Sequence, residues 1–148
     1  MGGAIAAAML LVSLAVNGAG VGSAQAGEPE AFRLVINPES PATQVDRAFI
    51  ADAFLKKVTR WPDGEAIRAV DQRFEAPARQ SFSRDVLRRS LAAIRNYWQQ
   101  RIFTGRGVPP PELASDQAVL DYVRQHRGAV GYVSASAETR SVKVIELR

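Results

Sequence analysis

Runs of apolar residues with strand-like and helix-like spacing divide the chain into short elements. Residues 31–36 (AFRLVI), 66–70, 129–134 (AVGYVS) and 142–147 (VKVIEL) are short apolar runs, several of them β-branched. Turn residues or loops flank most of them, which is typical of strands. The pattern therefore predicts a mixed sheet of about four strands.

Between these runs, apolar residues recur every three or four positions, as they do on one face of a helix. Helices are predicted near 44–58, 78–103 and 116–126, and the second is either one bent helix or two consecutive ones. Thr43 and Ser115 are expected to cap the first and third helices. Because strands and helices interleave without internal repeats, the predicted fold class is α/β. The predicted core includes Phe49, Phe54, Leu91, Ile94, Val123 and Tyr132.

The first 26 residues differ from the rest because they contain no charged side chain. They carry the apolar run AIAAAMLLVSLAV and end in Ala24-Gln25-Ala26, which fits a small-x-small cleavage site. The run is too short for a normal membrane-spanning helix. We expect a signal peptide over 1–26, cleaved after Ala26, and a single periplasmic domain over 27–148 without a membrane span. A retained N-terminal anchor is the alternative.

Charge and cysteine content narrow the possible functions. The chain has 19 basic and 15 acidic residues, a net charge of +4 that suits an anionic ligand or an acidic surface. It has no block of consecutive basic residues, which argues against nucleic-acid binding. It also has no cysteine, which excludes disulfides, thiol chemistry and cysteine-ligated metals.

Three segments resemble phosphate-binding proteins of ABC phosphate importers. The run IADAFLKKVTRWPDG, ending at Gly64, is similar to their IFLGKITNWNDG segment, and GAVGYVS at 128–134 is similar to their GAIGYV segment. Residues 70–82 (VDQRFEAPARQSF) fall where those proteins carry a strand, an arginine and a Ser-Gly-Thr turn that opens a helix. The resemblance implies a single lobe of the type 2 periplasmic-binding fold, with a mixed sheet flanked by helices.

The same alignment implies that the phosphate site has lost its donors. Gln72 falls where the family has its ligand-binding arginine, and Ala76, Pro77 and Ala78 fall on the Ser-Gly-Thr positions. Hydroxyl and guanidinium contacts to phosphate are worth roughly 1.5–3 kcal/mol each. Pro77 also lacks an N–H group to donate. The expectation is therefore weak or absent phosphate binding.

A helix start can still attract an anion through its free N–H groups and positive dipole end. Arg73, Arg79 and Ser81 lie within a few residues of the predicted helix start and are the candidate anion-binding residues. The competing interpretation is that both arginines are solvated surface charges beside Asp71 and Glu75.

Other chemistry-bearing residues have plainer explanations. Gly105-Arg106-Gly107 forms either an amide nest or a tight loop, and Trp61 and Trp98 either line a groove or pack in the core. His126, the only histidine, is placed at a helix C-terminus, and Arg88, Arg89 and Arg95 are placed on a solvated helix face. A lone histidine and scattered carboxylates make neither a metal site nor a catalytic triad. No metal, cofactor or enzymatic activity is predicted.

Two functional hypotheses remain open from the sequence. In the first, the chain is a weak solute-binding-like module for phosphate or another small oxyanion, completed by a dimer or by another protein, with an ABC permease or another envelope protein as the partner. In the second, the fold is kept as a scaffold that docks another envelope protein. Positive charge and the family resemblance favour the first, whereas the missing hydroxyl groups favour the second.

Overall fold

The computed structural model describes residues 31–148, and the signal-peptide prediction for 1–26 lies outside them. Strand β1 (Phe32–Ile36) lies between β6 (Ala129–Ser134) and β7 (Lys143–Val144) and is antiparallel to both. Strand β3 (Arg68–Ala69) adds to the far side of β6 in parallel, so the strand order is β3-β6-β1-β7. This arrangement confirms the predicted mixed sheet of four strands.

The central strand pair is buried on both faces. Leu34 of β1 lies opposite Tyr132 of β6, and both side chains belong to a large core cluster on one face. Val35 and Val133 point to a smaller cluster on the other face. Alternate residues of a strand point to opposite faces, so one apolar strand supplies both cores.

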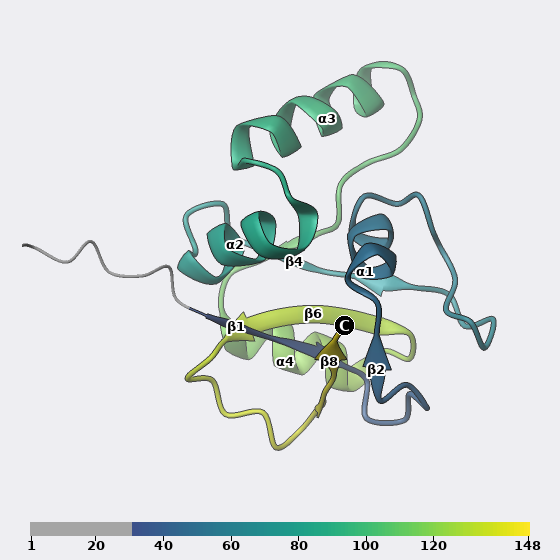
Figure 1. Cartoon of the computed structure of the whole chain (residues 1–148), viewed down its shortest axis with the longest axis vertical. Coiled ribbons are helices and arrows are strands. Elements are labelled where there is room, and N and C mark those ends of the chain that lie inside the picture. Colours follow the sequence, from purple (N-terminus) through teal and green to yellow (C-terminus); the bar gives the residue numbers. More distant parts are fainter. Residues whose placement is uncertain (1–30) are drawn as a thin grey trace, which may run out of the picture.

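Helices cover the two faces of this sheet (Figure 1). Helix α4 (Asp116–Gln125) packs on the smaller core through Val119, Leu120 and Val123. On the other face lie α1 (Arg47–Phe54), α2 (Pro77–Phe82) and the π-helix η1 (Ser83–Leu87). Helix α3 (Leu91–Phe103) lies farthest from the sheet and buries only Ile94 and Trp98.

Two short parallel ladders complete the structure. β2 (Gln44–Val45) pairs with β8 (Glu146–Leu147), and β4 (Asp71–Gln72) pairs with β5 (Glu112–Leu113). Each ladder joins segments that are far apart in the sequence. The second ladder places two acidic residues, Asp71 and Glu112, in register.

Several predicted boundaries were wrong. The first helix begins after Asp46, which is its N-cap, and Thr43 does not cap it because residues 44–45 form β2 instead. The helix ends at Phe54 rather than near residue 58. The predicted strand 142–147 is interrupted at Ile145, and its halves, β7 and β8, belong to different sheets.

The helical segment after Pro77 consists of consecutive helices, one of the two alternatives expected. It breaks at Arg88, which has a φ of 54°, and resumes after Ser90, whose hydroxyl accepts a bond of 3.1 Å from the Ala93 N–H. Ser115 caps α4 in the same way, as predicted. Gly128 follows α4 with a positive φ of 72°.

The predicted core is mostly confirmed. Phe54, Ile94, Val123 and Tyr132 are buried. Phe49 and Leu91 are only partly buried, because Phe49 packs at the margin of the large cluster and Leu91 begins the outlying helix α3. Trp61 and Trp98 are also buried, which supports the packing interpretation of both. Within residues 31–148, no helix combines the length and hydropathy needed to cross a bilayer.

Candidate functional site

The segment singled out by the sequence lies at the β4–β5 ladder and the start of α2. The Asp71 N–H donates to the Pro111 carbonyl at 2.8 Å, and the Arg73 N–H donates to the Leu113 carbonyl at 3.2 Å. These bonds hold Glu112 beside Asp71. The chain then turns and enters α2 at Pro77, with Ala76 as an N-cap that provides no side-chain bond. The turn therefore keeps a strand–turn–helix path without hydroxyl donors.

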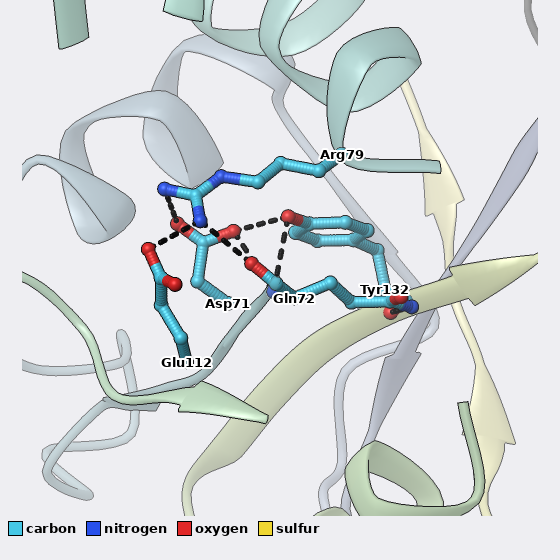
Figure 2. A network of polar contacts seen from close by, with 5 residues as sticks. All are labelled: Asp71, Gln72, Arg79, Glu112 and Tyr132. Atoms are coloured by element: carbon cyan, nitrogen blue, oxygen red, sulfur yellow. Dashed lines mark hydrogen bonds and ion pairs between the residues drawn. The ribbon is translucent and has the colours of Figure 1, made fainter. Parts of the chain in front are cut away.

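Arg79, in the first turns of α2, points back toward β4 and β5 (Figure 2). Its Nη1 donates to Glu112 Oε1 at 2.5 Å and to the Gln72 carbonyl at 2.6 Å, and its Nη2 lies 3.2 Å from Asp71 Oδ2. The Arg79 side chain is only 7% exposed, whereas that of Glu112 is 49% exposed. The guanidinium is therefore enclosed by two carboxylates of the same chain.

Tyr132 of β6 completes the polar network from the opposite side (Figure 2). Its hydroxyl donates to Asp71 Oδ1 and accepts a bond of 3.3 Å from the Gln72 N–H. The Tyr132 ring is fully buried and stacks on Phe82, with ring centroids 4.1 Å apart. Asp71 therefore has partners on both carboxylate oxygens, although it is almost completely buried.

Gln72 occupies the position where the resemblance places a ligand-binding arginine. Its amide Nε2 donates to Asp116 Oδ1 at 2.7 Å and to the Tyr132 carbonyl at 2.9 Å. Asp116 also accepts from the Ser134 N–H at 3.0 Å. Gln72 thus links β4, β6 and the start of α4 and is satisfied within the protein.

Burial and these contacts shift the pKa values of three side chains in the network. Burial raises the pKa of the Asp71 carboxyl, although Arg79 and the Tyr132 hydroxyl act in the opposite direction. Burial opposes the charge of Arg79, but Asp71 and Glu112 outweigh it and raise the pKa of the guanidinium. Burial and the neighbouring Asp71 charge also raise the pKa of the Tyr132 phenol. Arg79 therefore stays positively charged, and Tyr132 remains a hydrogen-bond donor.

The three candidate anion-binding residues have different environments. Arg73 is exposed, Arg79 is buried in the network, and Ser81 is fully buried in α2. The interpretation of both arginines as solvated charges is therefore correct for Arg73 and wrong for Arg79. Sequence reasoning missed Glu112 as a partner of Arg79 and Tyr132 as a partner of Asp71. The only local signal for Tyr132 was its place in the apolar run 129–134.

The Gly105–Gly107 loop and His126 contribute no second site. Gly105 and Gly107 both have positive φ values, and the Arg106 carbonyl accepts a bond of 2.9 Å from Arg101, as expected of a tight loop after α3. His126 is the C-terminal cap residue of α4 and stacks on Tyr122, with centroids 4.0 Å apart. Within residues 31–148, no group of three or more histidine, aspartate or glutamate residues could hold a metal ion.

The solved structures with a similar fold include proteins named for phosphate transport. An ABC-type phosphate transport receptor from Vibrio cholerae matches 80% of this chain with a TM-score of 0.62 at 19% identity. A protein assigned as a phosphate ABC transporter substrate-binding protein, solved with bound phosphate, from Clostridium perfringens matches the same share with a TM-score of 0.61 at 17% identity. PstS from Borrelia burgdorferi matches with a TM-score of 0.57 at 11% identity.

These matches cover only part of each solved chain. The chain covers 46%, 45% and 47% of the three solved chains, which is less than half of each. Its sequence matches no protein-family model and no curated protein. At these sequence identities the likeness establishes the fold, and the described residues have the α/β fold of one lobe of these binding proteins.

Proposed function

We propose that this chain is an exported, non-enzymatic protein of the solute-binding fold that does not bind phosphate tightly. The observation that carries the proposal is the position of Arg79 between Asp71 and Glu112. With both carboxylates ionised, the trio has one net negative charge. Asp116 adds another carboxylate next to Gln72. Phosphate would meet a guanidinium that internal anions already occupy.

The local free energies support this proposal. The turn offers no hydroxyl at Ala76 or Ala78 and no N–H at Pro77. Phosphate binding with a dissociation constant of 1 mM already requires about 4 kcal/mol. An exposed ion pair to Arg73 would contribute no more than about 1 kcal/mol. We therefore place the phosphate affinity of the turn at millimolar or weaker.

We infer that the chain docks a component of the cell envelope, such as an ABC permease or another exported protein. The similar solved proteins belong to phosphate transport, which supports the permease as one such partner. Export itself rests on the predicted signal peptide over residues 1–26.

A second candidate function is weak oxyanion binding at Arg73, Arg79 and Ser81. The exposed half of the Glu112 side chain favours it, because a half-exposed carboxylate can move into solvent when an external anion takes its place. In this view Glu112 acts as an internal competitor for Arg79. The two candidates differ in what happens when Glu112 is removed.

Calorimetric titration of phosphate and sulfate into the purified protein tests the first candidate. We expect no saturable binding at micromolar concentrations, and submicromolar phosphate binding would overturn the proposal. Glu112→Ala and Glu75→Ala each remove one negative charge near the turn, but only Glu112 contacts Arg79. A gain of about tenfold in phosphate affinity for Glu112→Ala alone would favour the second candidate. Equal, unchanged affinities would favour the first.

A further inference from the structure

A cavity of about 600 Å³ lies away from the Arg79 network, where the start of β1 meets the C-terminal strands. Its apolar wall consists of Phe32 and Leu34 from β1 and of Val144, Ile145 and Leu147 from the C-terminal segment. Val144 is 44% exposed, although it is an apolar strand residue. The volume is within the range of pockets that hold small organic ligands.

The rest of the cavity wall is basic. Arg33, Arg47 and Arg88 line it from β1, the start of α1 and the end of η1, and Asp85 is the only acidic residue among them. Asp85 is held in two bonds, 2.6 and 2.8 Å long, by the adjacent Arg84. The cavity wall therefore carries an excess of positive charge after its single carboxylate has been neutralised.

The arginines differ in how far they are already engaged. The Arg47 guanidinium donates to the Asp85 backbone carbonyl at 2.8 Å, which fixes its position at the cavity. Neither Arg33 nor Arg88 has a side-chain hydrogen bond or ion pair with any residue in the described range 31–148. The hydrogen bond from Arg84, followed by the charges of Arg84, Arg47 and Arg88, lowers the pKa of Asp85. The field at this wall thus favours an anion.

The backbone that presents Arg88 is unusual. Arg88 ends the π-helix η1 in the left-handed conformation, with φ 54° and ψ 35°. Glycine adopts this conformation more readily than any residue with a Cβ atom. Isolated π-turns and strained residues are frequent at functional sites. An arginine at this position gives the cavity a charged group that glycine, the residue preferred by the backbone, would not provide.

We propose that this cavity binds a small amphipathic anion. Its carboxylate, sulfonate or phosphate head would contact Arg47 and Arg88, and its aliphatic or aromatic body would cover the apolar wall that includes Val144. The basic residues and the apolar residues line the same cavity, so a matching ligand needs both an anionic head and an apolar body. The proposal is independent of the Arg79 network, none of whose residues line this cavity.

Three probes separate the contributions of head and body. Decanoate carries both, decyltrimethylammonium carries the same chain with the opposite charge, and inorganic phosphate carries an anionic head alone. In calorimetric titrations below the micelle concentration, decanoate should bind at least about tenfold more tightly than either of the others. Equal binding of the two decyl ions, equal binding of phosphate, or no saturable decanoate binding would overturn the proposal.

A matched pair of glycine variants tests the arginine. Arg88→Gly should weaken decanoate binding about tenfold while leaving thermal stability unchanged or higher, because glycine fits φ 54°. Lys56 has the same φ but does not line the cavity, so Lys56→Gly should keep the decanoate affinity of the original protein. Unchanged binding by Arg88→Gly, or an equal loss in both variants, would contradict the assignment.

Two further variants keep the test independent of the backbone at residue 88. Arg47→Gln removes a guanidinium that lines the cavity and should also weaken decanoate binding. Asp85→Asn removes the only carboxylate of the cavity wall and should tighten it. Unchanged decanoate affinities, or changes in the opposite directions, would contradict the proposal that an anionic head is bound at this wall.

Discussion

The guanidinium of Arg79 lies 3.2 Å from the carboxylate of Asp71, and the two side chains are only 7% and 9% exposed. A buried pair of this kind joins α2 to the β4–β5 ladder. Its net contribution to stability is modest, because both charges lose their hydration on burial and this penalty offsets their attraction. Losing one partner is more damaging, since the other charge then stays buried without compensation.

The first prediction follows from this asymmetry. Arg79→Ala should lower the free energy of unfolding by about 3 kcal/mol, because Asp71 would lose its cationic partner. Arg73→Ala, six residues earlier, removes an exposed arginine and should change it by no more than about 0.5 kcal/mol. Chemical denaturation of the two variants measures both values. Similar losses for both would mean that Arg79 is not held as tightly as the structure indicates.

The second prediction concerns pH. Because burial raises the pKa of Asp71 above its ordinary value of 3.8, the folded protein holds this proton more tightly than the unfolded chain does. The stability that Asp71 contributes is therefore present at low pH and is lost as the pH rises through its folded pKa. Asp71→Asn cannot ionise, so the variant should gain stability relative to the original protein as the pH rises from about 4 to 8.

Denaturation curves of both proteins across that range provide the measurement. Glu138→Gln, which removes a largely exposed carboxylate, serves as the control and should show no comparable trend. If the original protein instead gained stability relative to Asp71→Asn with rising pH, the attraction of Arg79 would outweigh burial. The direction assigned to the Asp71 pKa would then be wrong.

The third prediction concerns two glycines with positive φ. A Cβ atom at Gly128 would lie 2.0 Å from the Ala66 carbonyl oxygen, whereas one at Gly105 would meet nothing within 4 Å. Gly105→Ala should therefore lower the free energy of unfolding by about 1 kcal/mol, through backbone strain alone. Gly128→Ala should cost about 3 kcal/mol or more, because backbone on both sides must move. Thermal melts of the pair separate strain from steric overlap, and equal shifts would contradict this distinction.

The fourth prediction concerns export. If residues 1–26 are a signal peptide, intact-mass analysis of protein from the envelope fraction should find a chain that begins at Gly27. Ala26→Lys should block this cleavage, since signal peptidase sites require a small residue there. A full-length cytoplasmic product from the unaltered gene would overturn the predicted localisation.

The sequence predicted those elements whose signals are local. Residues 129–134 combine β-branched and aromatic residues, and α4 has a serine cap together with regular apolar spacing, so both were found close to their true limits. The start of α1 was misplaced because Gln44 and Val45 pair with Glu146 and Leu147. Contact with a distant segment overrode a local helical pattern there.

Pairing between distant segments also explains why the sequence did not reveal Glu112 as a partner of Arg79. The β4–β5 ladder has two residues on each side, which is too short for any periodicity to be visible. Glu112 follows three prolines and has the appearance of an ordinary loop charge. Arginine is seldom buried unless it is paired. The burial of Arg79 thus depends on a carboxylate that sequence spacing could not connect to it.

The pairing of β1 with β6 also affects how the protein folds. Phe32 lies opposite Ser134 and Ile36 opposite Val130, so the central ladder closes a loop that spans most of the described chain. Closing a long loop costs conformational entropy before its contacts form, and such topologies fold slowly. Helix α4 and strand β6 are adjacent in sequence and can associate early. The sheet itself cannot form until residues 129–134 have emerged from the ribosome, so a nascent chain lacks its core for most of its synthesis.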